Sequence, residues 1–130
     1  MKVYRVEHPS NSTGPYQSGA HYGLSGYREI HNAMINAHCN HVNDHPTPGY
    51  ENLQVEGRVC GCKTLKSLKA WFGDFLPKLI QLGFIIKEFD LPEDAVCCGL
   101  KQVTFDASRA TDSRVIRLRN SRNKSFQKKA

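Results

Sequence analysis

Glycine and proline interrupt this chain so often that no helix or strand in it can be long. Ten glycines and six prolines fall within 130 residues, and two segments, 8–26 and 41–53, are dense in residues that favour turns. Short stretches with helical or alternating hydrophobic spacing lie between these segments. The pattern predicts an α+β fold with a small mixed or antiparallel sheet and two to three helices.

The expected elements follow from periodicity and from capping residues. Strands are predicted at 2–7, 56–62 and 84–90, on both sides of Gly99 with the second at 101–105, and as a further edge strand at 115–118. One helix is predicted after a cap at Ser25 and ends near residue 39. Two more are predicted after Thr64 and after Asp74, and Gly73 and Gly83 are expected to end them.

Charge divides the chain into two parts. Residues 1–106 carry 10 Lys and Arg against 11 Asp and Glu, whereas residues 107–130 carry 8 against 1. We therefore predict one compact domain over 1–106 and a basic, partly disordered tail over 107–130. Such a tail can neutralise phosphates or dock on a partner, so a nucleic acid or another protein is a candidate partner. The residues singled out for this role are Arg114, Arg117, Arg119 and Arg122.

Several classes of protein are not expected from this sequence. No apolar run exceeds four residues, which is far fewer than the roughly 20 of a membrane helix, and the N-terminus lacks the apolar stretch of a signal peptide. We therefore expect a protein of the cytosol without a membrane partner. No phosphate-binding Walker loop, dinucleotide-binding glycine fingerprint or His-Glu-x-x-His motif occurs.

Histidines and cysteines gather in the middle of the sequence. Imidazole and thiolate are natural zinc ligands, but the Cys-x-Cys spacing is tighter than usual for zinc. We interpret the five cysteines as reduced thiols, mostly buried, and assign no metal site. A cysteine nucleophile with a histidine base is an alternative, although the sequence selects no particular cysteine. The group comprises His38, Cys39, His41, His45, Cys60 and Cys62.

Several local motifs together resemble a group of small proteins of bacteriophage and prophage genomes that largely lack an assigned function. The likeness covers about residues 3–105 and implies an accessory protein that acts inside the infected cell. The motifs are Tyr-Arg-Val-Glu-His-Pro at 4–9, Gly-Pro-Tyr at 14–16, His-Pro-x-Pro at 45–48, Cys-Gly-x-x-Thr-Leu through Trp-Phe at 60–72, Leu-Gly-Phe at 82–84 and Gln-Val-x-Phe at 102–105.

A second resemblance is to ADP-ribosyltransferases, which split a small α+β fold around NAD. It implies catalytic roles for Arg5 on the first strand, Thr64 (or Ser67 behind it) before a helix, and Gln102 on a late strand. An arginine can clamp a pyrophosphate, and a hydroxyl can hold a ribose. Active members usually carry glutamate where this chain has Gln102.

These observations lead to two functional hypotheses. The first is a phage protein of host takeover or anti-defence that engages a nucleotide, NAD or an ADP-ribose derivative, either to transfer ADP-ribose or to sequester a nucleotide signal. Its pocket is predicted to use Arg5 and, as ligand-binding residues, His8, Tyr16, Tyr22 and His45. Trp71 and Phe72 are interpreted as core residues, and Arg5 could instead form an ion pair with Glu7 or Glu88. The second hypothesis is a non-enzymatic inhibitor that binds a host protein or nucleic-acid complex through its surface and basic tail.

Overall fold

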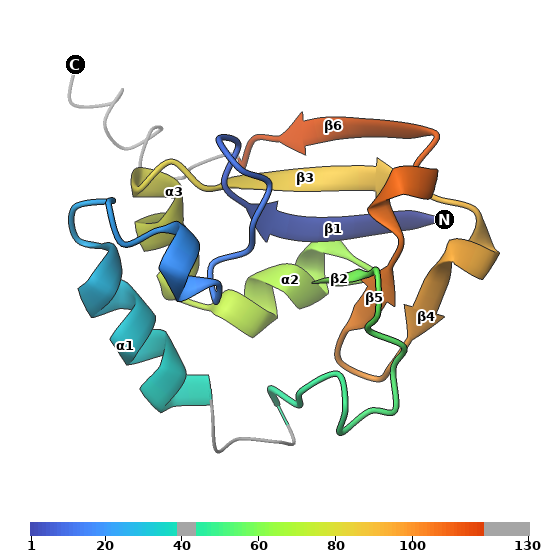
Figure 1. Ribbon diagram of the computed structural model, residues 1–130, viewed down its shortest axis with the longest axis horizontal. Helices are drawn as coiled ribbons and strands as arrows, with labels where there is room; N and C mark the ends of the chain where they lie inside the picture. Colours follow the sequence, from blue (N-terminus) through green and yellow to red (C-terminus); the bar gives the residue numbers. More distant parts are fainter. Residues whose placement is uncertain (39–43, 119–130) are drawn as a thin grey trace, which may run out of the picture.

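Two small antiparallel sheets form the framework of the protein. The computed structural model describes residues 1–38 and 44–118. The first sheet has the order β1 (Lys2–Glu7), β3 (Ile85–Asp90), β6 (Asp112–Ile116). The second has the order β2 (Val59–Gly61), β5 (Val103–Phe105), β4 (Val96–Cys98). Figure 1 shows the first sheet above the shorter strands of the second.

Among the described residues, one isolated β-bridge connects the two sheets. Tyr4 N donates to Cys62 O at 2.8 Å, and Cys62 N donates to Tyr4 O at 2.7 Å. Gly61 lies at this crossing, where a Cβ atom would come within 2.7 Å of Tyr4 O. The absence of a side chain at Gly61 therefore lets β2 approach β1 closely.

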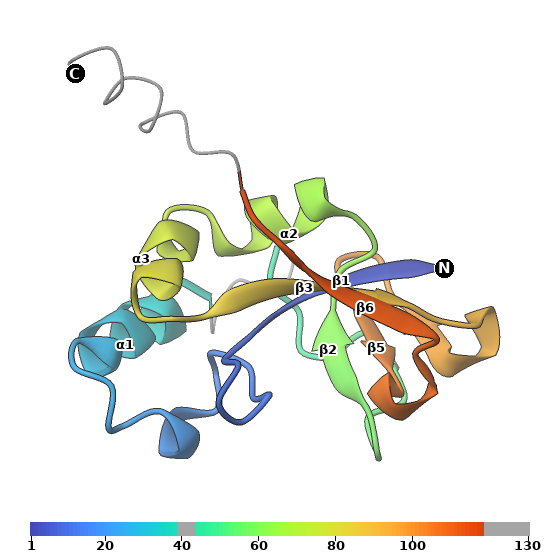
Figure 2. The ribbon, with the colours of Figure 1, turned by 90° about the horizontal axis from the view of Figure 1, so that it is seen from above.

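Three helices complete the fold: α1 (Tyr27–His38), α2 (Leu65–Phe72) and α3 (Phe75–Gln81). Short 3₁₀ turns, η1 (Ser18–Ala20), η2 (Glu93–Ala95) and η3 (Ala107–Arg109), lie in the connections. Figures 1 and 2 show α1 and α3 together at one end of the molecule, with α2 beside β1 and β2. No helix in the described part of the chain is long and apolar enough to cross a membrane.

Two clusters of buried apolar side chains hold these layers together. The larger one lies between the helices and one face of the first sheet and includes Tyr27, Met34, Leu79, Phe84 and Ile86. The smaller one joins the two sheets and includes Val3, Phe89, Leu91, Val103 and Phe105. Burial of these side chains supplies the main driving force for folding.

The predicted α+β class, with antiparallel sheets and three helices, is confirmed. Thr64 caps α2 through reciprocal bonds with Ser67, and Gly73 and Gly83 have positive φ angles of 55° and 97° where α2 and α3 end. Asp74 precedes α3 but forms no capping bond through its side chain.

Other boundaries differ from the prediction. The first helix begins at Tyr27, after Gly26 in a left-handed conformation, so Ser25 is not adjacent to its first turn. The edge strand begins at Asp112 because it follows the register of β3, with Asp112 opposite Asp90. β6 therefore extends the sheet into the segment predicted as a basic tail. Residues 119–130 of that segment lie outside the described residues.

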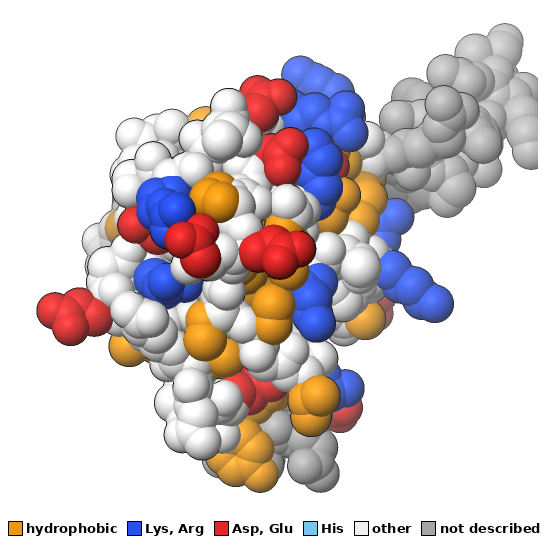
Figure 3. All heavy atoms as spheres, turned by 90° about the vertical axis from the view of Figure 1, so that its right-hand side faces the viewer, with side chains coloured by type: hydrophobic (Ala, Val, Ile, Leu, Met, Phe, Trp, Pro, Cys, Tyr) orange, Lys and Arg blue, Asp and Glu red, His pale blue; other side chains and the backbone are white. Residues whose placement is uncertain are grey.

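Charged side chains of both signs are mixed on the face seen in Figure 3, with hydrophobic side chains between them. One ion pair of this mixed kind joins Arg109 Nη2 to Asp94 Oδ1 at 2.9 Å. Such interspersion is typical of a solvated surface.

Candidate functional site

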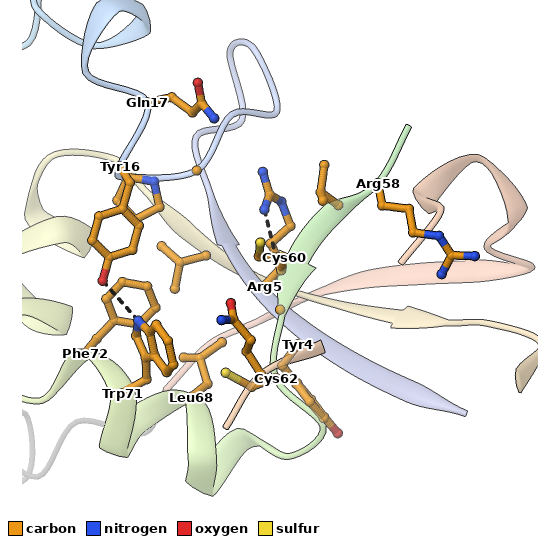
Figure 4. Close-up of a pocket in the computed structure, with 16 residues that line it drawn as sticks. Tyr4, Arg5, Tyr16, Gln17, Arg58, Cys60, Cys62, Leu68, Trp71 and Phe72 are labelled. Atoms are coloured by element: carbon orange, nitrogen blue, oxygen red, sulfur yellow. Dashed lines mark hydrogen bonds between the residues drawn. The ribbon is translucent and has the colours of Figure 1, made fainter. Parts of the chain in front are cut away.

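A hollow of about 220 Å³ opens where β1 and β2 meet the carboxyl-terminal end of α2. The turn-rich segment at Gly14–Gln17 forms its opposite wall (Figure 4). The side chains that matter for its chemistry are Arg5, Tyr16, Cys60, Trp71, Phe72 and Gln102. Three of the predicted site residues, Arg5, Tyr16 and Gln102, therefore line one cavity.

Arg5 supplies the positive charge of the hollow. Its side chain is 10% exposed, and Nε donates to Glu7 Oε1 at 3.1 Å. Nη1 donates to Cys60 O at 2.9 Å, and Nη2 lies 3.5 Å from Ser12 O. Burial lowers the pKa of the Arg5 guanidinium, while Glu7 opposes this shift. The group stays protonated, so the hollow contains a fixed, largely desolvated cation.

The segment that faces Arg5 is held in place by a buried histidine. His21 is 1% exposed, and its Nε2 lies 2.9 Å from both Gly14 O and Thr13 Oγ1. Gly14 lies so close that a Cβ there would be 3.4 Å from Arg5 Nη2. His21 thus fixes the distance between this segment and the guanidinium.

Aromatic side chains form the wall beside α2. Trp71 Nε1 donates to Tyr16 Oη at 3.0 Å, and Tyr16 lies over Phe72 with ring centroids 6.1 Å apart and planes inclined by 24°. Figure 4 shows these three rings grouped together, across the hollow from Arg5. Such a wall can contact the flat face of a ligand.

Two stacked histidines support this wall from behind. The rings of His38 and His45 lie 3.7 Å apart and nearly parallel, at 11°. His38 Nδ1 is 2.7 Å from Tyr16 Oη, and His45 Nε2 donates to Trp71 O at 2.6 Å. His45 Nδ1 is buried and has no hydrogen-bond partner among the described residues. His45 therefore positions Trp71 and does not line the hollow.

Gln102 connects the hollow to the segment 44–54. It is 6% exposed, and its Nε2 donates to Pro46 O. The neighbouring Thr104 Oγ1 donates to Gln54 O, and Glu51 Oε2 accepts from Leu100 N and Lys101 N. Side chains thus fasten this segment, which has no helix or strand, to β5 and to the turn before it.

The two cysteines of the hollow are poor candidates for nucleophiles. Burial raises the pKa of the Cys60 thiol above its ordinary value, although nearby Arg5 opposes the shift, and burial raises that of Cys62 to about 12. Both thiols are therefore protonated at neutral pH. Cys60, Cys62, Cys97 and Cys98 are free, and Cys39 lies outside the described residues.

Three other predicted site residues, His8, Tyr22 and Thr64, do not line the hollow. His8 Nδ1 is 2.8 Å from Ser10 Oγ, and its ring packs edge-on against Phe84. Tyr22 is 53% exposed and lies under the Arg28 guanidinium.

Thr64 uses its hydroxyl in the α2 cap, and His41 is not among the described residues. Within the described ranges, no group of three or more His, Cys, Asp or Glu residues is arranged to hold a metal ion.

The predicted partner-binding arginines are only partly covered by the structure. Arg114 Nε donates to Glu88 Oε1 at 2.9 Å across β6 and β3, and the pairing raises the pKa of Arg114 and lowers that of Glu88. Arg117 is exposed, and Arg119 and Arg122 lie outside the described residues.

Sequence reasoning missed Trp71 and Arg58 as lining residues. Trp71 shares a helical face with apolar neighbours, which is the usual pattern of a core position. Arg58 Nη1 donates to Ala95 O at 2.8 Å, and Figure 4 shows its side chain directed away from Arg5. A signal for Trp71 was present, since an indole N–H needs a partner and Tyr16 provides one.

Comparison with known proteins gives one relationship. The family model described as "Bacteriophage T4 Y00F protein" matches residues 1–119. No curated protein and no solved structure matches the chain.

Proposed function

Since the chain belongs to the Bacteriophage T4 Y00F protein family, we propose that it is a phage accessory protein that binds a nucleotide during host takeover or against host defence. The nucleotide is NAD or an ADP-ribose derivative, and its site is the hollow between β1, β2 and α2. Membership of a phage family supports the biological setting of this proposal, and the chemistry of the hollow supports the ligand class.

One observation carries the ligand assignment: a buried guanidinium faces an aromatic wall across a small cavity. Arginine binds phosphate oxygens, and aromatic rings contact the flat face of a base. The described lining residues include the buried Arg5 and no aspartate or glutamate. An anionic ligand with a planar group matches this combination.

The size of the hollow sets how much of the ligand it can hold. Sites for complete drug-sized ligands usually measure about 300–1,000 Å³, whereas this hollow measures about 220 Å³. It therefore accommodates one part of NAD or ADP-ribose, with the rest of the molecule outside it.

Binding is a better match to the geometry than ADP-ribosyl transfer. The resemblance to transferases implied joint action of Arg5, Thr64 and Gln102. Thr64 accepts the Ser67 amide at 3.0 Å within the α2 cap, and Gln102 donates to Pro46 O. Neither group is arranged to stabilise positive charge at a breaking glycosidic bond, so sequestration of a nucleotide signal is the form of the proposal that we favour.

Calorimetric titration of the purified protein with 5′-AMP, NAD and ADP-ribose tests the proposal. We expect binding that weakens at least 10-fold in Trp71→Ala and in Arg5→Lys, because lysine cannot replace a planar, multidentate guanidinium. Tyr50→Ala is the matched control, since Tyr50 is 63% exposed and does not line the hollow.

Two outcomes decide against parts of this proposal. If none of the three nucleotides binds, the nucleotide function is wrong, and the rival hypothesis of a protein-binding inhibitor gains support. If labelled NAD and host lysate give a modified band that disappears in Arg5→Lys, transfer replaces sequestration.

A further inference from the structure

We infer that the site continues past Arg5 into a second groove that accepts a sugar, so that the ligand class is a nucleoside diphosphate sugar. This inference rests on the proposed nucleotide function and deepens it. The observation that carries it is a juxtaposition: Arg5 and Val59 line both the hollow and a larger open groove of about 670 Å³.

The second groove lies between the first sheet and the segment around η3. Its lining includes β1, β3 and β6 residues, the η3 turn and Ser12. Ser12 belongs to the groove and Gly14 belongs to the hollow. The segment 12–14 therefore passes between the two spaces, beside the guanidinium that borders both.

The groove differs from the hollow in its chemistry. Four hydroxyl side chains line it: Ser12, Ser108, Thr111 and Ser113. A hydroxyl can both donate and accept a hydrogen bond. Ser108 Oγ donates to Asp106 Oδ1 and Thr111 Oγ1 donates to Asp90 O, so these two oxygens serve a ligand as acceptors. The charged lining residues balance, with Arg5 and Lys87 against Glu7 and Asp112. A neutral group with many hydroxyls matches this lining better than a further phosphate does.

Glu7 is the side chain that makes this groove selective. It is 5% exposed, and its Oε1 accepts from Arg5 Nε at 3.1 Å. Its Oε2 lies 3.8 Å from Lys87 Nζ, which is longer than a hydrogen bond. That oxygen keeps acceptor capacity for a ligand hydroxyl, as carboxylates do when they bind ribose. The same negative charge repels a phosphate.

Arg5 accordingly separates two parts of one ligand. The base contacts the aromatic wall in the hollow, the phosphates lie next to the guanidinium, and the sugar beyond them reaches Glu7 and the hydroxyls. This arrangement also accounts for the small volume of the hollow, because the second groove supplies the room that the rest of the ligand needs.

Titration calorimetry with paired ligands tests the inference. AMP and UMP are compared with ADP-ribose and UDP-glucose, and we expect at least one sugar nucleotide to bind 10-fold or more tightly than its monophosphate. Ser113→Phe fills the groove and should abolish this advantage while leaving the affinity for the monophosphate unchanged. Val115→Phe is the matched control, because Val115 lies on the same strand and the same side, is 49% exposed and does not line the groove.

A second variant addresses Glu7 directly. Glu7→Gln keeps the shape of the side chain, and we expect it to weaken binding of the sugar nucleotide at least 5-fold more than it weakens binding of the monophosphate. Equal affinity for sugar nucleotides and monophosphates overturns this inference and leaves the proposed function standing. An advantage that survives Ser113→Phe also overturns it. If none of the four ligands binds, the proposed function fails together with it.

Discussion

Replacing Gly61 by alanine tests whether the close contact between β1 and β2 holds the two sheets together. An added Cβ would lie 2.7 Å from Tyr4 O, 2.9 Å from Val3 Cγ1 and 3.0 Å from Phe105 Cε1. The first of these atoms is backbone and accepts the bridging bond from Cys62 N. The strands must therefore separate by several tenths of an ångström, and the bridge must lengthen.

Two effects of the substitution lower the stability and a third raises it. Overpacking of this kind costs about 1–3 kcal/mol, and weakening a backbone hydrogen bond adds about 1 kcal/mol. Alanine also lowers the conformational entropy of the unfolded chain, which stabilises the folded protein by roughly 0.4–1 kcal/mol. We expect a net loss of about 2 kcal/mol in the free energy of unfolding, which lowers the urea midpoint by roughly 1 M.

Urea denaturation followed by circular dichroism measures this change. Gly23→Ala is the matched control, because no atom lies within 4 Å of its added Cβ and its φ angle is not positive. It should stay within about 0.5 kcal/mol of the parent protein. Equal midpoints for the two variants would refute the argument that β2 needs a bare backbone at this crossing.

Three further predictions concern the surroundings of the hollow. Tyr27→Phe removes a fully buried hydroxyl that donates to Pro15 O, so it should lower the free energy of unfolding by about 1–3 kcal/mol in urea titrations. Burial lowers the pKa of His21 below its ordinary value of 6.5, so the unfolded chain binds a proton at this histidine more readily than the folded protein does. The free energy of unfolding should therefore fall as the pH drops below about 6.5. His21→Gln should weaken this pH dependence in denaturation series between pH 7 and 5. Thr64→Ala removes the α2 cap and should cost about 1 kcal/mol by thermal denaturation, with unchanged stability contradicting the capping role.

The sequence predicted best those features that depend on neighbouring residues. Thr64, Gly73 and Gly83 act through their own turns, so the ends of α2 and α3 are readable from local chemistry. The start of β6 cannot be read from local sequence. Pairing with β3 places Asp112 opposite Asp90, so this register depends on a strand more than 20 residues away.

The candidate site likewise contains some residues that the sequence identifies and others that it does not. Arg5, Tyr16 and Gln102 were selected from motifs, and all three line the hollow. Trp71 was interpreted as core because helical spacing alone does not distinguish a core ring from one at the edge of a cavity. The resemblance to transferases implies a catalytic role for Thr64, but a Thr followed by Ser three residues later also suits a helix cap, which is the role that Thr64 has.

The segment 44–54 takes its shape from its neighbours. Gln102 and Thr104 both donate to its main-chain carbonyl groups, at Pro46 and Gln54, and every residue type provides such a group. Substitution of Pro46 or Gln54 therefore still leaves a carbonyl group that can accept the hydrogen bond from Gln102 or Thr104. Glu51 is different, since its own carboxylate accepts the amides of Leu100 and Lys101. Among these three contacts with β5 and the turn before it, Glu51 is the position where related chains should have least freedom to vary.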